Sequence, residues 1–375
     1  MIFYTLLTAA VIGLSLFVNN HVEAPAYGVS RRQALNGLAL FSSFLLLFTV
    51  AALRMNVGND YAKYCEFFHL IRCKLDTPTT VPTEAGFNAV CILIYLLCGR
   101  QELYPVMFAF FALVTLLLFY KGMYRLSDCF PLTFFLFMTL GYYFQSFSTV
   151  RYYFALSIAL FSIRYVIEKQ WAKFVLLILF GAFFHKSLLL VLPMYLLSQL
   201  SLTWWMYALA GAAFISCPLF SDFYMSVFLK LYPTYEATEY LEGGTSYISI
   251  LRCAAVFVFS LFFYRKHIKQ DRTLNFYFNC NLMGLMIYTC CFFLPVISRI
   301  GYYLSITHIL FVPALILKIE DAKYRKAVTG LVLLSGLVYF GVFILYKASG
   351  PGLSILPYRT FLYHKMVTIL SEVSP

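Results

Sequence analysis

The chain has few charged residues: only 12% of its 375 residues are Asp, Glu, Lys or Arg. It contains no P-loop, no G-x-G-x-x-G, no H-E-x-x-H, no G-x-S-x-G and no D-x-D sequence. Its ten cysteines include no C-x-x-C pair and no Cys/His spacing suited to zinc. These absences argue against a soluble nucleotide-binding enzyme, a zinc protein and the metal-dependent handling of a nucleotide sugar.

Apolar residues dominate instead, at 62% of the chain, with a mean hydropathy of +0.81. The apolar runs are too long for barrel strands, so we expect an all-α, polytopic integral membrane protein forming a single transmembrane domain over 1–375. About twelve transmembrane helices are expected, at residues 1–19, 34–53, 104–120, 130–147, 150–167, 172–184, 187–199, 203–218, 247–264, 275–295, 300–318 and 327–346. The apolar stretch 85–98 is short for a span, and we interpret it as an interfacial or re-entrant helix.

The basic residues predict which side of the membrane each loop occupies. Five short loops hold 15 of the 28 Lys and Arg residues and are assigned to the cytoplasm: 20–33, 121–129, 164–173, 265–274 and 318–326. The N-terminus is then outside, and the first apolar run, which lacks a basic n-region, is a retained helix. The +12 charge lies in short juxtamembrane clusters without interleaved aromatics, so no nucleic acid is expected as a partner.

Three outer segments follow from this topology. The first outer loop, 54–103, is expected to carry interfacial helices. Its Cys65 and Cys73 are expected to be free; the alternative is a disulfide between them, since the loop is predicted to lie outside. The second outer loop, 219–246, is acidic and aromatic. The tail, 347–375, is amphipathic and is expected to lie on the outer surface.

Cations next to apolar runs gather on the predicted outer side, although burying an Arg near hydrocarbon costs about 2.5–3.5 kcal/mol. The first is Arg54, which with Asp60 forms the cluster Arg54-Met-Asn-Val-Gly-Asn-Asp60-Tyr61 after a predicted span. The planar guanidinium suits a phosphate at headgroup depth, and the carboxylate could deprotonate a sugar hydroxyl. The alternatives are an Arg that extends to lipid headgroups and an Asp that caps the helix beginning near Tyr61.

Two further clusters occupy tight outer turns. Arg151 opens an apolar run, where a helix N-terminus already favours anions; the alternative is an ion pair with a loop carboxylate. His185 and Lys186 join two apolar runs. His185 could orient an acceptor hydroxyl, act as a base or contact phosphate, or it could simply be a packed hydrogen-bonding residue.

The last outer cations are Arg252 and Arg299, both expected at outer-leaflet depth. Together with the other clusters they would form a site for an anionic, lipid-attached substrate. The alternative for each is an intramembrane salt bridge, with Glu84 or Glu242 as the partner.

The order of these clusters resembles the EpsG family of Wzy-type bacterial polysaccharide polymerases. The matching residues are Arg54…Val57-Gly58-Asn59-Asp60-Tyr61…Tyr64, Glu84-Ala-Gly86-Phe87, Arg151 with Ala155, His185-x-Ser187 before Leu192-Pro193, and Arg299…Tyr302-Tyr303. The family pattern has Asn before the central arginine and Gln after it, whereas this chain has Thr149-Val150 and Tyr152.

The resemblance implies a metal-independent, cofactor-free enzyme related to the GT-C-type membrane glycosyltransferases. Its donor and acceptor would be repeat-unit oligosaccharides on undecaprenyl diphosphate, at the outer face of a bacterial cytoplasmic (inner) membrane, with a chain-length regulator as a further candidate partner. The active site would face the periplasm or the exterior. In related enzymes an acid in the first outer loop is the base.

These considerations predict a role for each candidate residue. We expect Asp60 to be the general base, with Glu84 and His185 as the next candidates. The residues expected to bind the diphosphate are Arg54, Arg151, Lys186, Arg252 and Arg299. The residues expected to hold sugars are Tyr61, Tyr64, Tyr152, Tyr302 and Tyr303. Two alternatives remain open: another lipid-linked glycosyl transfer, by a ligase or a single-sugar transferase, and a flippase or transporter of lipid-linked sugars.

Overall fold

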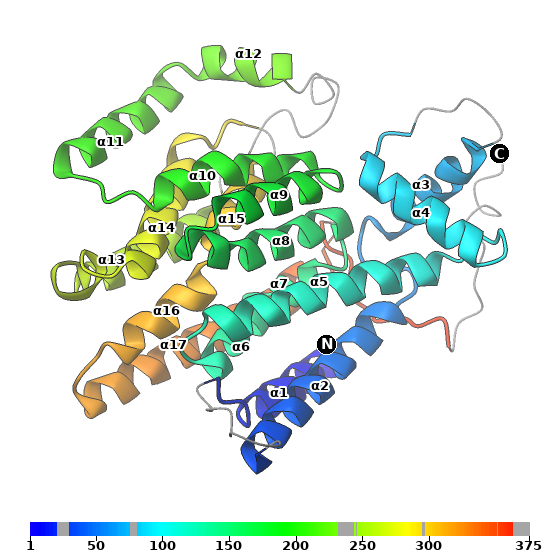
Figure 1. The fold of residues 1–375 in the computed structure, drawn as a ribbon, viewed down its shortest axis with the longest axis horizontal. Coiled ribbons are helices and arrows are strands. Elements are labelled where there is room, and N and C mark those ends of the chain that lie inside the picture. The colour runs from blue at the N-terminus through cyan, green and yellow to red at the C-terminus, as the bar shows by residue number, and fades with distance from the viewer. Residues whose placement is uncertain are drawn as a thin grey trace. The chain divides into compact units, whose positions relative to one another are not determined.

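In the computed structural model, the described residues are 1–20, 30–75, 81–231, 244, 246–294, 297–350 and 352–362. Within these ranges the fold is all-α, with seventeen α-helices, which confirms the expected fold class (Figure 1). The chain divides into two compact units. The first unit comprises Met1–Phe161, Leu176–Leu188 and Ile319–Pro375, and the second comprises Ser162–Val175 and Leu189–Lys318.

The first unit is built around long helices from both ends of the chain. Its helices are α1 (Ile2–Ser15), α2 (Arg31–Ala52), α3 (Tyr61–Cys73), α4 (Ala85–Leu97), α5 (Tyr104–Leu126), α6 (Phe130–Thr139), α7 (Tyr142–Gln145) and α17 (Ala322–Val342). α2 packs along α1 and α5, α6 packs against α1, α5 and α17, and α3 packs against α4. A capping box begins α2, since Ser30 and Gln33 exchange side-chain-to-backbone hydrogen bonds.

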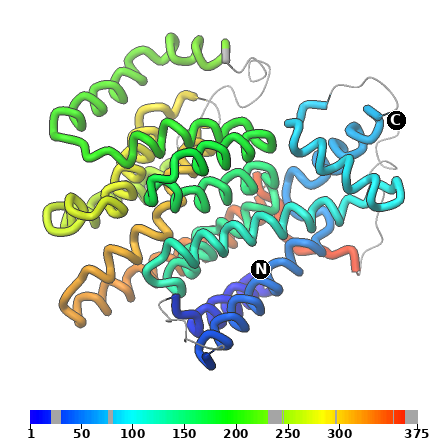
Figure 2. The backbone as a smooth tube through the Cα atoms, in the orientation of Figure 1, coloured from blue at the N-terminus to red at the C-terminus, as the bar shows by residue number. Residues whose placement is uncertain are grey.

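The second unit surrounds one helix, α14 (Arg272–Cys290). Its other helices are α10 (Val191–Ser198), α11 (Trp204–Leu219), α12 (Ser221–Leu231), α13 (Tyr247–Leu261), α15 (Ile297–Ser305) and α16 (His308–Leu317). α14 packs against α10, α11, α13, α15 and α16. In the trace of Figure 2, the chain of α13 leads into α14. Two more helices, α8 (Val150–Ile167) and α9 (Trp171–Ala182), contribute residues to both units.

The chain is a multi-pass membrane protein, but with fewer spans than the sequence predicted. Among the described residues, five helical segments are long and apolar enough to cross a membrane, and a sixth if α11 and α12, bent by 86°, count as one span. The five segments are Arg31–Ala52, Tyr104–Leu126, Val150–Ile167, Ile297–Leu317 and Ala322–Lys347. The expected number of about twelve is therefore too high.

Helix length explains most of this correction. Six other apolar helices have only 10–17 residues, and at about 1.5 Å per residue they fall short of a hydrocarbon core about 30 Å thick. The run 130–147 breaks at Gly141, whose φ of +79° separates α6 from α7. α14 has 19 residues, but Asn275, Asn279 and Asn281 make it less apolar.

The predicted outer segments are described in part. The stretch 85–98 forms the 13-residue helix α4, about 20 Å long and too short to span. The second outer loop contains α12 as far as Leu231, and its tyrosines and glutamates at 232–243 lie outside the described residues. In the tail, residues 352–362 are not helical, and 363–375 lie outside the described residues. Cys65 and Cys73 are both free, as expected.

Candidate functional site

The Arg54 loop follows α2 and turns sharply because of Gly58. Gly58 has a φ of +102°, and a Cβ there would lie 2.2 Å from the Phe147 carbonyl oxygen. Only glycine fits both this backbone conformation and this approach. The Asn59 backbone N–H also donates to Ser148 Oγ at 3.3 Å. The loop is thereby held against the turn that leads to Arg151.

Arg54 is a buried cation between two aromatic rings. Its side chain is 2% exposed, and its Cζ lies 4.9 Å from the ring centroid of Phe108 and 4.8 Å from that of Phe147. One Nη donates to the Ala51 carbonyl at 3.4 Å. Within the described part of the chain, no carboxylate lies within 4.0 Å of it. The two rings stabilise the charge of Arg54 by cation–π interaction.

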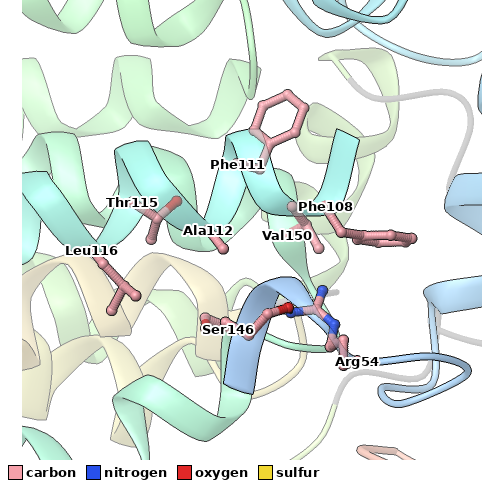
Figure 3. Close-up of a pocket in the computed structure, with 9 residues that line it drawn as sticks. Arg54, Phe108, Phe111, Ala112, Thr115, Leu116, Ser146 and Val150 are labelled. Atoms are coloured by element: carbon pink, nitrogen blue, oxygen red, sulfur yellow. The ribbon is translucent and has the colours of Figure 1, made fainter. Parts of the chain in front are cut away.

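Arg54 also lines a very small cavity. Figure 3 shows its side chain directed from the end of α2 toward α5, with Ser146 and Phe108 beside it. The cavity measures about 10 Å³, roughly enough for one water molecule. Burial lowers the pKa of Arg54 to about 10, and the neighbouring Tyr61 opposes this shift. The guanidinium therefore stays charged near neutral pH.

The C-terminal segment 352–362 covers the Arg54 loop. Arg54 and Thr360 form an antiparallel bridge, and backbone hydrogen bonds join Met55 to Arg359 at 2.9 Å and Gly58 to Ser354 at 2.9 Å. Ser148 Oγ donates to the Leu353 carbonyl at 2.7 Å. Arg54, the first residue expected to bind an anion, therefore lies beneath segment 352–362. This contact joins residues about 300 positions apart in the sequence.

A second cation, Arg151, pairs with Glu84. Arg151 Nη1 donates to Glu84 Oε2, and the two side chains are 18% and 14% exposed. The other carboxylate oxygen, Oε1, accepts the backbone N–H of Lys186 at 3.3 Å. Glu84 thus links the start of α4, the start of α8 and the turn after α9. The ion-pair alternative considered for Arg151 is the one observed.

Close backbone packing holds this junction together. The Gly86 N–H donates to the Phe183 carbonyl at 2.8 Å, and a Cβ on Gly86 would lie 2.8 Å from the same oxygen. Glycine at position 86 therefore lets α4 approach the 183–187 turn closely enough for Glu84 to reach Lys186. Glu84-Ala-Gly86 is one of the sequence patterns that the family resemblance singled out.

Aromatic side chains surround Arg151. Its Cζ lies 5.8, 5.7 and 5.5 Å from the ring centroids of Tyr64, Phe67 and Phe87. Its backbone N–H donates to the Tyr64 hydroxyl at 3.2 Å. Burial raises the pKa of Tyr64, so the phenol is neutral and can accept this bond. Tyr64 therefore supports the start of α8, and its hydroxyl is already occupied.

Asp60 immediately precedes α3 and is half-buried. Its side chain makes no capping hydrogen bond to the helix, so the capping alternative is not observed. Its backbone carbonyl accepts from Tyr64 N at 3.0 Å, and its negative charge acts on the Tyr64 phenol. Asp60 thus lies one helical turn from the residue that supports Arg151.

His185 occupies the same junction. Its Nδ1 lies 3.2 Å from Ser187 Oγ, and its ring meets Tyr152 edge-on at 5.6 Å between centroids. His185 is half-buried, whereas Lys186 is exposed. The packed arrangement considered for His185 is therefore the one observed, and its role in proton transfer stays a prediction.

The expected tyrosines differ in what they can offer a sugar. Tyr61 is 4% exposed and stacks on Phe108 at 4.3 Å, and Tyr64 and Tyr152 are 5% and 3% exposed. All three pack inside the first unit, where a sugar could not stack on them without rearrangement. Their role as sugar-binding residues stays a prediction.

The remaining expected residues belong to the second unit. Arg252 Nη2 donates to Ser305 Oγ at 3.1 Å, and its Cζ lies 5.7 Å from the Tyr302 ring centroid. Tyr303 is fully buried, and its carbonyl accepts from the Tyr195 hydroxyl at 2.8 Å. Arg299 is half-buried on α15. Of the two carboxylates suggested as their salt-bridge partners, Glu84 pairs with Arg151, and Glu242 lies outside the described residues.

Some residues that hold the first unit together were not singled out from the sequence. Phe108 and Phe147 hold Arg54, but nothing in the sequence distinguishes them among forty phenylalanines. Glu102 receives hydrogen bonds from Arg72 at 2.9 Å and Tyr104 at 2.6 Å. It also contacts His69 Nδ1 at 3.0 Å and so ties α3 to the start of α5. The only sequence feature that could have indicated Glu102 is its position as an isolated acid before an apolar run.

The first unit therefore combines groups suited to an anionic substrate. Lys186, an exposed cation, donates its backbone N–H to Glu84 of the Glu84–Arg151 pair, and the half-buried Asp60 lies one helical turn before Tyr64, which supports Arg151. Fixed cations can stabilise a leaving diphosphate, and a nearby carboxylate can take a hydroxyl proton. Such a set can transfer a glycosyl group.

Comparison with known proteins gives one match. The family model described as the EpsG family matches residues 38–360, which include all thirteen candidate residues and most of the segment 352–362 that covers Arg54. No curated protein matches the chain. No solved structure matches it either.

Proposed function

The chain belongs to the EpsG family, which implies a role in exopolysaccharide biosynthesis, and on this premise we propose that it is a polysaccharide polymerase. The substrates are oligosaccharide repeat units carried on undecaprenyl diphosphate at the outer face of a bacterial cytoplasmic membrane. The growing glycan passes from its lipid carrier to the non-reducing-end hydroxyl of another lipid-linked unit. The GT-C-like character and the outward-facing site belong to this proposal.

The observation that carries the proposal is the junction of Glu84, Arg151, His185 and Lys186 in the first unit, together with Asp60, which lies one helical turn before the Tyr64 that supports Arg151. These residues come from four separate segments, and each was singled out by its position next to an apolar run. Their convergence is expected of a site for a charged group attached to a lipid. It is not required for folding, because apolar side chains would fill the same space at lower cost.

The reaction assigns a role to each group. The acceptor hydroxyl oxygen attacks the anomeric carbon of the donor, a new glycosidic bond forms, and the bond to the diphosphate breaks. Undecaprenyl diphosphate leaves with the electron pair, and Asp60 takes the hydroxyl proton. Asp60 is preferred to Glu84 as the base because Glu84 is engaged by Arg151 and by the Lys186 N–H.

The exposure of each cation decides which role it is assigned. The exposure of Lys186 and the 18% exposure of Arg151 support a role for both in binding the diphosphate. Arg54 is 2% exposed beneath segment 352–362, so it contacts a diphosphate only if that segment moves. Without such a movement, Arg54 affects the diphosphate only through its long-range electrostatic potential. Contacts of Arg252 and Arg299 with the same diphosphate stay a prediction.

The test is a product gel. Purified protein in nanodiscs is incubated with its cognate undecaprenyl-diphosphate repeat unit in the presence of EDTA. We expect a ladder spaced by one repeat, which Arg151→Ala abolishes and which Lys63→Ala, a change of an exposed cation on α3, preserves. A single-step product would indicate another glycosyl transfer. Movement of the lipid-linked unit across a vesicle bilayer, without a ladder, would indicate a transporter.

A further inference from the structure

The second unit contains a cavity of about 510 Å³ that the proposed reaction does not use. It lies where three connections meet: the one between α8 and α9, the one between α10 and α11, and the one that leads into α14. Its volume is in the range of small-molecule sites, about 300–1,000 Å³. The connection between α8 and α9 and the one that leads into α14 fall within two loops, 164–173 and 265–274, whose basic residues predicted a cytoplasmic position.

The cavity is lined by three cations and by no carboxylate. Lys169, Lys269 and Arg272 come from two of the three connections. Within the described residues, none of the three has a carboxylate within 4.0 Å. The neighbouring Asp271 is engaged elsewhere, because its Oδ1 accepts two backbone N–H groups in the first turn of α14. The lining therefore has a formal charge of +3.

The neutral polar groups of the wall hold this arrangement in place. Arg272 Nη2 donates to Gln199 Oε1 at 2.7 Å, which orients the guanidinium. Asn275, 8% exposed, donates from Nδ2 to the Leu200 carbonyl at 3.1 Å, and Asn279 donates to the same carbonyl at 2.9 Å. The turn after α10 is thereby fixed to α14. The cavity wall is built before any ligand arrives, which lowers the cost of binding.

The preference for basic residues in cytoplasmic loops does not explain this arrangement. That preference acts on the number of Lys and Arg in a loop and is indifferent to whether they face a common cavity. Here cations from two loops face one cavity whose wall is fixed by buried amides. We propose that this cavity binds a phosphate-bearing anion, supplied either by an anionic phospholipid headgroup or by a soluble phosphorylated metabolite. Lys and Arg bind phosphate through charge-assisted hydrogen bonds.

The experiment uses the full-length purified protein and two probes. The first probe is inorganic pyrophosphate, titrated by calorimetry into protein in zwitterionic nanodiscs. The second is phosphatidylglycerol against phosphatidylcholine, with retained lipid counted by native mass spectrometry. The variant is Lys169→Gln with Lys269→Gln, because both side chains are exposed and their loss leaves the fold intact. The matched control is Lys326→Gln, an exposed cation of the first unit.

We expect the double variant to raise the Kd of one of the two probes by about tenfold or more, because two charged contacts are lost. Lys326→Gln should bind both probes like the wild type. Loss of pyrophosphate binding identifies a soluble ligand, and loss of phosphatidylglycerol retention identifies a lipid. Arg272→Gln should act in the same direction. Unchanged binding of both probes in the double variant, or a loss confined to Arg151→Ala, overturns the proposal. None of these outcomes depends on polymerase activity.

Discussion

Glu84, at the start of α4, forms an ion pair with Arg151, at the start of α8, across 67 positions of sequence. The pair is largely shielded from water, and the Lys186 N–H occupies the second carboxylate oxygen. A charge pair in this position joins three segments of the first unit. It is the central feature of the candidate site.

Arg151→Lys tests whether the planar guanidinium matters beyond its charge. The substitution keeps the charge toward Glu84 but loses the fork of donors, so we expect polymer yield to fall at least about tenfold while the protein still folds. The measurements are the product ladder and the Tm in detergent. Wild-type activity in this variant would assign Arg151 a purely structural role.

Glu84→Gln tests the other half of the pair. It leaves Arg151 without its counter-ion in a largely buried position, and we expect about 1–3 kcal/mol of destabilisation. A lower Tm with shortened or absent polymer is expected. Restoration of the Tm by Glu84→Asp, measured alongside, separates loss of the ion pair from a folding defect.

Asp60→Asn tests the proposed general base. Asn has nearly the same size and shape as Asp, so we expect the free energy of unfolding to change by no more than about 1 kcal/mol. Polymer should nevertheless be abolished, because the amide cannot accept the hydroxyl proton. Insertion and Tm are compared with those of Asn59→Ala, a change of the exposed neighbour. Long chains made by Asp60→Asn would remove this residue from the mechanism.

Arg54→Met separates stability from activity at the buried cation. Arg54 has no carboxylate partner in the described residues, so an apolar side chain of similar length should leave the Tm unchanged or raise it. If the charge serves the substrate, polymer yield falls in the same variant. A lower Tm with normal polymer would instead assign Arg54 a packing role between Phe108 and Phe147.

Truncation tests the segment that covers Arg54. A chain ending at Gly350 loses the backbone hydrogen bonds to residues 53–59, and we expect about 2–5 kcal/mol of destabilisation and loss of polymer. A chain ending at Leu362 keeps these bonds and is the matched control. Limited proteolysis near residue 56 should be faster only in the shorter chain. Equal behaviour of the two chains would contradict a role for this segment.

Glu102 predicts a pH dependence of stability. Burial by itself raises the pKa of Glu102, but hydrogen bonds from Tyr104, Arg72 and His69 outweigh it and hold this pKa below its usual value. Because the folded pKa is depressed, the stabilisation is present above the unfolded value of about 4.3 and is lost as the pH falls through the folded pKa. The Tm difference between the wild type and Glu102→Gln should therefore be greatest near neutral pH and shrink toward pH 3. A constant difference would exclude this linkage.

Much of the architecture could be predicted from composition and pattern. The long apolar runs predicted an all-α, multi-pass membrane protein, and the shortness of 85–98 predicted the short helix that α4 is. The number of spans was wrong because hydropathy does not reveal where a helix breaks. Gly141 interrupts one run, and another bends by 86° between α11 and α12.

The sequence alone determined the fold class, the family and the set of charged residues next to apolar runs, because these depend on residue type and spacing along the chain. Only the tertiary structure decided their partners. It placed Glu84 against Arg151, Arg54 between Phe108 and Phe147, and residues 352–362 over the Arg54 loop. Each contact joins segments far apart in the chain, and local pattern does not specify which distant side chain will neutralise a buried charge.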